Sequence, residues 1–117
     1  LRGVDCSGLI YQATNGSTPR NTSSLINFGT GLEIAGLSAS EIASMLQPLD
    51  LIVWNGHVII VFDESTVIES TGGDGVHKSD LLSRLKSVMK EKTPVNDWGS
   101  KKGKRFVIRR WIDVENP

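Results

Sequence analysis

The stretch DLIVWNGHVIIVFDESTVIES, residues 50–70, decides the fold. It contains three short runs rich in β-branched residues, and the residue pairs "NG" and "DE" separate them. Turn residues between such runs are typical of antiparallel hairpins. The sequence therefore predicts strands at 50–54, 57–62 and 65–70, joined as two successive hairpins. Because the runs are almost continuously apolar, we expect both faces of these strands to be covered.

Helical patterns lie on both sides of this strand region. Ser38 and Glu41 have the spacing of a capping box, and Pro48 ends the helix that they begin. Residues 5–14 and 79–91 also place apolar residues at helical spacing. Helices followed by strands, without regular alternation, predict an α+β fold around an antiparallel sheet.

Composition limits the classes of function. The chain has 117 residues, no net charge and one cysteine, which fits a single domain over residues 1–117 without an internal disulfide. No apolar run is long enough to span a bilayer. Because the sequence begins at Leu1 without Met, we expect a fragment of a longer chain whose N-terminal part is missing.

The stretch GSKKGKRFVIRRW, residues 99–111, concentrates six cations around a last predicted strand. A nucleic-acid patch and a solvated hairpin turn both fit this composition. The chain as a whole is not basic, and aromatic residues do not alternate with these cations. We therefore favour the solvated turn and expect no nucleic-acid partner.

The lone cysteine, Cys6, lies in VDCSGLIYQA, residues 4–13. It falls in the first turn of the predicted helix 5–14, where Asp5 is a suitable N-cap. Unpaired N–H groups at a helix N-terminus favour the thiolate and can hold a developing oxyanion. A buried structural cysteine is the alternative, and this stretch alone leaves both open.

A nucleophilic thiol requires a base, and the chain offers His57 and His77. His57 begins an apolar strand, whereas His77 lies in the polar segment GGDGVHKS, which we expect to be a solvated loop. Glu69 follows His57 by 12 residues, and a tight hairpin brings it beside the ring to accept the second N–H. A core histidine and an exposed strand carboxylate are the alternatives for these two positions.

Five segments taken in order resemble the NlpC-type cell-wall cysteine peptidases. They are Asp5-Cys6-Ser7-Gly8-Leu9, Pro19-Arg20-Asn21, Leu49-Asp50-Leu51-Ile52, Gly56-His57-Val58 and Glu69. The resemblance runs from about residue 4 to residue 72. The chain departs from the family at three positions: Glu69 replaces the usual His, Asn or Gln, Leu49 replaces a Gly, and Ile59 replaces a small residue.

The resemblance implies a papain-like NlpC-type domain, in which an N-terminal helix bearing the cysteine packs on an antiparallel sheet bearing the histidine. It implies hydrolysis of amide bonds in peptidoglycan stem peptides, of the D-glutamyl-diamino acid endopeptidase type. Cys6 is then the nucleophile, His57 the acid and base, and Glu69 the group that orients the ring.

The resemblance also implies a substrate site and a location. Asp5 and Ser7 match positions that line the cleft. Arg20 is expected to bind substrate carboxylates, and Trp54 to form a cleft wall or part of the core. The expected partner is a muropeptide outside the cytoplasm, with no metal or organic cofactor. An amidase or acyltransferase of the same fold, or a non-catalytic cell-wall-binding module, remains an alternative.

Overall fold

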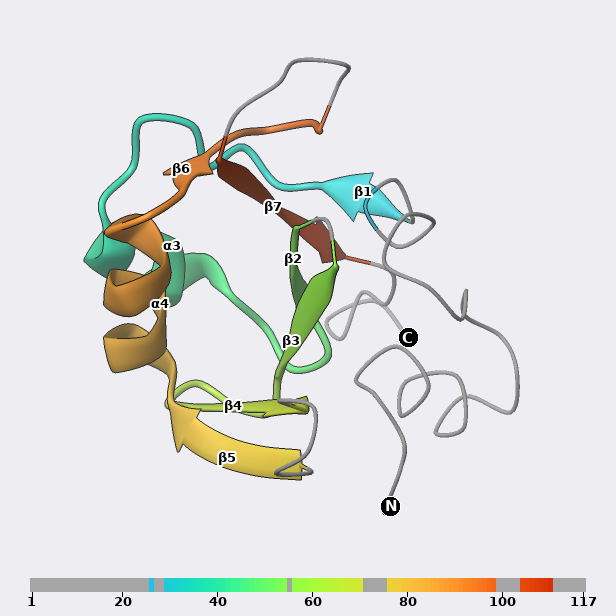
Figure 1. The fold of residues 1–117 in the computed structure, drawn as a ribbon, viewed down its shortest axis with the longest axis vertical. Helices are drawn as coiled ribbons and strands as arrows, with labels where there is room; N and C mark the ends of the chain where they lie inside the picture. The colour runs from blue at the N-terminus through green and yellow to red at the C-terminus, as the bar shows by residue number, and fades with distance from the viewer. Residues whose placement is uncertain (1–25, 27–28, 55, 71–75, 99–103, 111–117) are drawn as a thin grey trace.

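The computed structural model describes residues 26, 29–54, 56–70, 76–98 and 104–110. Within them the chain forms an α+β fold, as predicted, with two helices against a largely antiparallel sheet (Figure 1). The elements are β1 (Thr30–Gly31), α3 (Ala39–Met45), β2 (Leu51–Trp54), β3 (His57–Val61), β4 (Thr66–Ser70), β5 (Val76–Asp80), α4 (Leu81–Met89), β6 (Thr93–Pro94) and β7 (Arg105–Arg110). The predicted helix at 5–14 lies outside the described residues.

The two predicted hairpins form the middle of the sheet. Strands β2, β3 and β4 pair in antiparallel order, with Trp54 opposite His57 and Ile59 opposite Glu69. The complete order is β1-β7-β2-β3-β4-β5, so the last strand lies between β1 and β2 (Figure 1). The short strand β6 pairs with β7 in parallel. The sequence predicted β7 itself but not its position inside the sheet.

The expected solvated loop around His77 is wrong, because Val76–Asp80 forms the edge strand β5. It pairs with β4 along its whole length and places His77 opposite Glu69. The segment is polar because its side chains are largely exposed at the edge of the sheet, so it lacks the apolar pattern used to recognise strands. Hydrogen bonds to β4, rather than intrinsic propensity, determine its conformation.

Helix α3 begins as its capping box predicts, whereas α4 begins two residues later than the predicted 79–91, because residues 79 and 80 belong to β5. At α3 the Ser38 hydroxyl accepts from the Glu41 amide, and the Glu41 carboxylate accepts from the Ser38 amide. At α4 the Asp80 carboxylate accepts from the Ser83 amide at 2.9 Å. Such caps satisfy backbone donors that have no partner within the helix.

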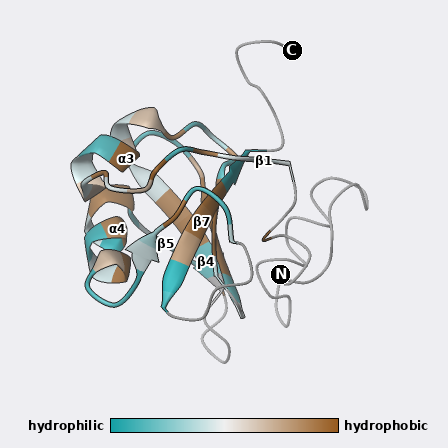
Figure 2. Ribbon diagram, turned by 90° about the horizontal axis from the view of Figure 1, so that it is seen from above, coloured by the Kyte–Doolittle hydropathy of each residue, from teal (hydrophilic) through white to brown (hydrophobic). Residues whose placement is uncertain are grey.

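The sheet is buried on both faces, as its apolar strands indicated. The helices α3 and α4 lie together on one face (Figure 1). That core contains Ile34, Ile42, Leu46, Ile52, Ile59, Val61, Val67, Leu81, Leu85, Val88, Phe106 and Ile108. The other face buries Ile26, Leu51, Val53, Val58, Ile60 and Val107. Figure 2 shows β7 with a hydrophobic middle between hydrophilic ends, in keeping with its interior position.

Two of the cations expected to be solvated, Arg105 and Arg109, are instead buried on β7. The Arg105 guanidinium lies 4.9 Å from the centre of the Trp98 ring. Arg109 donates to the Gly29 carbonyl at 2.8 Å. Their burial follows from the pairing of β7 on both sides, which the local sequence does not reveal.

A buried ion pair joins β7 to the start of β2. The Asp50 carboxylate is almost inaccessible and accepts two hydrogen bonds from Arg110, at 2.9 Å and 2.7 Å. It also accepts from the Gln47 amide at 2.8 Å. Arg110 in turn donates to the Met45 carbonyl at the end of α3. Asp50 and Arg110 together thus connect α3, the turn that follows it and β7.

Leu49, directly before Asp50, has a φ of 73°, in the left-handed region that favours glycine. This is a position where the resembling family carries Gly. Leu49→Gly and Leu49→Ala both remove the exposed side chain, but only Gly adopts this backbone conformation freely. We expect the Gly variant to be about 1 kcal/mol more stable than the Ala variant. Urea unfolding of the two variants measures the difference, and equal stabilities would contradict it.

Candidate active site

His57 is the first residue of β3 and the partner of Trp54 across the β2–β3 hairpin. The turn before it contains Gly56 at a φ of 96°, a conformation that a side chain would oppose. The Trp54 and His57 rings lie 5.0 Å apart between centres and tilt by 40°. The His57 side chain is 21% exposed, so the ring is fixed by its neighbours yet reachable from solvent.

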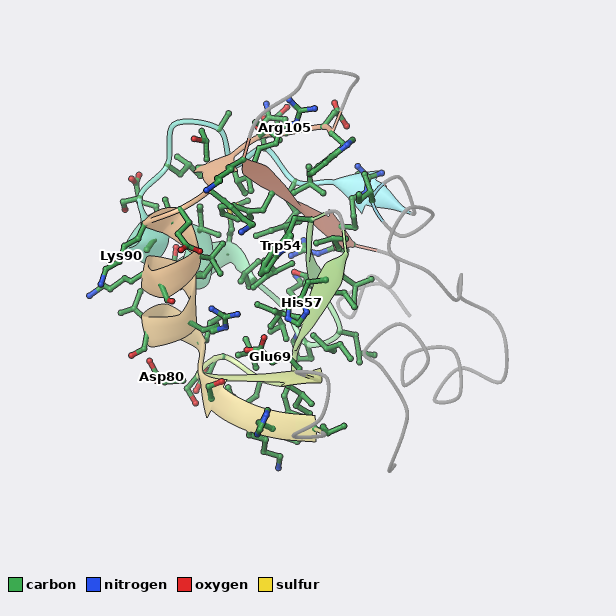
Figure 3. The ribbon with its side chains drawn as sticks, viewed as in Figure 1. Trp54, His57, Glu69, Asp80, Lys90 and Arg105 are labelled. Carbon is green, nitrogen blue, oxygen red and sulfur yellow. The ribbon has the colours of Figure 1, made fainter. Side chains whose placement is uncertain are left out.

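Glu69 lies beside His57, as the hairpin predicted. Glu69 is on β4, directly opposite Ile59 of β3. It is therefore the diagonal neighbour of His57 on the same face of the sheet. Its Oε2 is 2.7 Å from Nε2 of His57, and its side chain is only 5% exposed. Figure 3 shows His57 between Trp54 and Glu69.

A third member of this group, Arg84 on α4, was not predicted from the sequence. Its Nε donates to Oε1 of Glu69 at 2.6 Å, and its Nη2 donates to Oε2 at 3.1 Å. Arg84 follows the buried Leu81 by three positions and precedes the buried Val88 by four. A cation beside the apolar stripe of a helix needs a partner when the helix packs on the core. This position of Arg84 was the signal in the sequence that pointed to a buried carboxylate.

These contacts keep the Glu69 carboxylate ionised. Burial alone raises the pKa of Glu69, but hydrogen bonds from His57 and Arg84, with the positive charge of Arg84, outweigh it and lower the pKa from 4.5 to about 2. Glu69 is therefore an ionised group that only accepts hydrogen bonds, so Nε2 of His57 must be the donor. In the neutral ring Nδ1 is then the basic nitrogen, which gives His57 the form of a general base.

The surroundings of the pair are aromatic and cationic. Trp54 packs against the main core, and the Lys92 ammonium lies 4.5 Å from the centre of its ring. His77 is exposed on the edge strand, opposite Glu69. In the part of the chain that the structure describes, no three His, Cys, Asp or Glu side chains are grouped to hold a metal ion.

The structure brings together three of the predicted site residues, His57, Glu69 and Trp54. The other four, Asp5, Cys6, Ser7 and Arg20, lie outside the described residues. The described geometry is therefore that of a candidate base with its orienting group.

Comparison of the chain with protein-family models, with curated proteins and with solved structures gave no match. Among the described residues, no helix is both long and apolar enough to cross a membrane. A proposal of function therefore depends on the arrangement of the chain's own residues and on the resemblance of its motifs to the NlpC-type peptidases.

The lowered pKa of Glu69 predicts a pH-dependent stability. A carboxylate whose pKa falls on folding stabilises the fold above its unfolded value of 4.5, and this stabilisation is lost as the pH falls toward about 2. We expect the wild-type protein to have a higher free energy of unfolding than Glu69→Gln, and this difference should shrink by about 2 kcal/mol between about pH 6 and pH 3.

Urea unfolding of both proteins at several pH values measures this advantage. Glu64→Gln is the matched control, because Glu64 is an exposed carboxylate on the turn between β3 and β4. An advantage that does not change with pH would show that Glu69 gains nothing from its two partners.

Proposed function

We propose that the protein is a cysteine peptidase that hydrolyses amide bonds in peptidoglycan stem peptides, with Cys6 as nucleophile and His57 and Glu69 completing the triad. One observation carries the proposal: Nε2 of His57 lies 2.7 Å from the buried Glu69 carboxylate. This contact leaves Nδ1 as the basic nitrogen of a ring held by its neighbours. A catalytic histidine needs this arrangement, in which one nitrogen is anchored and the other receives the reacting proton.

The reaction proceeds by acyl transfer. The Cys6 thiol gives its proton to Nδ1 of His57, and the thiolate attacks the carbonyl carbon of the substrate amide. Backbone N–H groups, including that of Cys6, hold the resulting oxyanion. His57 then returns the proton to the leaving amine as the C–N bond breaks. A water molecule, deprotonated by His57, attacks the thioester and releases the acid, which regenerates the thiol.

The resemblance to the NlpC-type peptidases supports the fold, substrate and location of this proposal. It makes the α+β fold a papain-like domain and the scissile bond one between D-glutamate and a diamino acid, outside the cytoplasm. Asp5 and Ser7 then line the cleft, and Arg20 binds a substrate carboxylate. Trp54 has a specific place in the proposal, because its ring lies 5.0 Å from that of His57 and shields one side of it.

Alkylation of Cys6 at different pH values tests the dyad. A thiol paired with an imidazole ionises well below the free value of about 8.5, so we expect half-maximal reactivity at a correspondingly low pH. His57→Ala should move this midpoint up by at least about 1 pH unit, because the cation that stabilises the thiolate is lost. His77→Ala is the matched control and should leave the midpoint unchanged.

Muropeptide cleavage then tests the substrate. We expect the wild-type chain to release the amine product and Cys6→Ser to release none. A midpoint near that of a free thiol, with no response to His57→Ala, would contradict the proposal and favour a cell-wall-binding module. An activated thiol that transfers acyl groups without cleaving muropeptides would favour the acyltransferase alternative.

A further inference from the structure

We infer that Arg84 is a positioning residue for this site: it holds the Glu69 carboxylate on Nε2 of His57 and offsets the negative charge that the ring faces. The inference rests on the proposed function and adds a fourth residue to it. Arg84 acts through Glu69, and the structure records no contact between its guanidinium and the His57 ring.

The geometry leaves the Glu69 carboxylate little freedom. Nε and Nη2 of Arg84 hold its two oxygens at 2.6 Å and 3.1 Å, and Oε2 also accepts from His57 at 2.7 Å. A fork of two N–H groups fixes the plane of a carboxylate as well as its position. The guanidinium itself is braced within α4, where Nη1 donates to the Ser87 hydroxyl at 3.4 Å. The orientation of the His57 ring is thus transmitted from a helix through a carboxylate.

The charges explain what a cation does at this position. A buried carboxylate alone beside an imidazole stabilises the imidazolium and makes the ring slow to release its proton. A general acid works best when it loses its proton near the working pH. Arg84 partly neutralises the negative charge of Glu69 and places a positive charge near the ring. Both effects favour release of the proton that His57 must deliver to the leaving amine.

Two other ionisable groups lie near the pair. Among the described residues, His77 is opposite Glu69 on β5, and the Lys92 ammonium lies 4.5 Å from the centre of the Trp54 ring. His57 and Arg84 are the side chains recorded as donating to the Glu69 carboxylate. Arg84 is therefore the cation whose removal should affect His57 most.

An NMR titration of the His57 ring tests the inference without depending on the thiol. The experiment uses the full chain carrying Cys6→Ser, with the two histidines assigned through His77→Gln. Arg84→Met should raise the midpoint of the His57 titration by about 1 pH unit. Arg84→Lys, which keeps the charge but loses the fork, should shift it less. Lys92→Met is the matched control and should shift it by no more than a few tenths of a unit.

Kinetics in the chain with Cys6 intact provide the second measurement. Arg84→Met should lower kcat for muropeptide cleavage about tenfold with little change in KM, and should move the alkaline limb of the pH profile upward. Arg84→Lys should recover part of kcat. If Arg84→Met fails to fold, Arg84→Gln removes the charge while keeping a donor for Glu69. It should raise the midpoint of the His57 titration in the same direction.

The outcomes separate the two proposals. An unchanged His57 midpoint in the folded Met or Gln variant would overturn the role of Arg84, whatever the activity. A shifted midpoint in a chain whose wild type cleaves no muropeptide would support the coupling of Arg84 to His57 and overturn the peptidase function instead.

Discussion

The candidate site depends on the burial of one carboxylate. Moving an ionised carboxylate out of water costs several kcal/mol. If a partner is removed, part of that cost is no longer compensated. Glu69 is 5% exposed and is stabilised by His57 from β3 and Arg84 from α4. Each partner belongs to a different element, so satisfying this one charge fixes the hairpin and the helix relative to each other. The same contacts that make the charge tolerable also orient the imidazole.

A second buried carboxylate, Asp50, has the corresponding role at the other side of β2. It joins the start of that strand to Arg110 on β7 and, through Arg110, to the end of α3. The β2–β3 hairpin is therefore held from both sides, by Asp50 before β2 and by Glu69 beyond β3. His57, which begins β3, lies at the end of this hairpin that Glu69 contacts. A base that must keep one nitrogen directed toward a substrate benefits from such a position.

The sequence predicted the parts of the structure that local patterns determine. The β-branched runs and their turns predicted the two hairpins, and the spacing of His57 and Glu69 predicted their contact. The capping box at Ser38 likewise predicted where α3 begins. Each of these features is encoded within about 20 residues, so propensity and register were sufficient.

The parts that were missed depend on pairing between distant segments. The polar strand β5 forms because β4 offers it hydrogen bonds. Arg109 is buried because β7 enters the sheet between β1 and β2, which no local pattern records. Arg84 meets Glu69 only after α4 has packed on the sheet. Its position beside an apolar stripe indicated a need for a partner but not which carboxylate would supply it.

Glu69 and Arg84 are best understood as one unit. The resembling family uses His, Asn or Gln at the third position, and Glu69 adds a negative charge that the amides do not bring. A buried carboxylate favours the charged form of an adjacent imidazole, and a neighbouring cation opposes that effect. With the Arg84 fork in place, the carboxylate keeps its strength as a hydrogen-bond acceptor while its charge is offset. In the proposed mechanism, the adjacent helix thus supplies the charge that balances the orienting group.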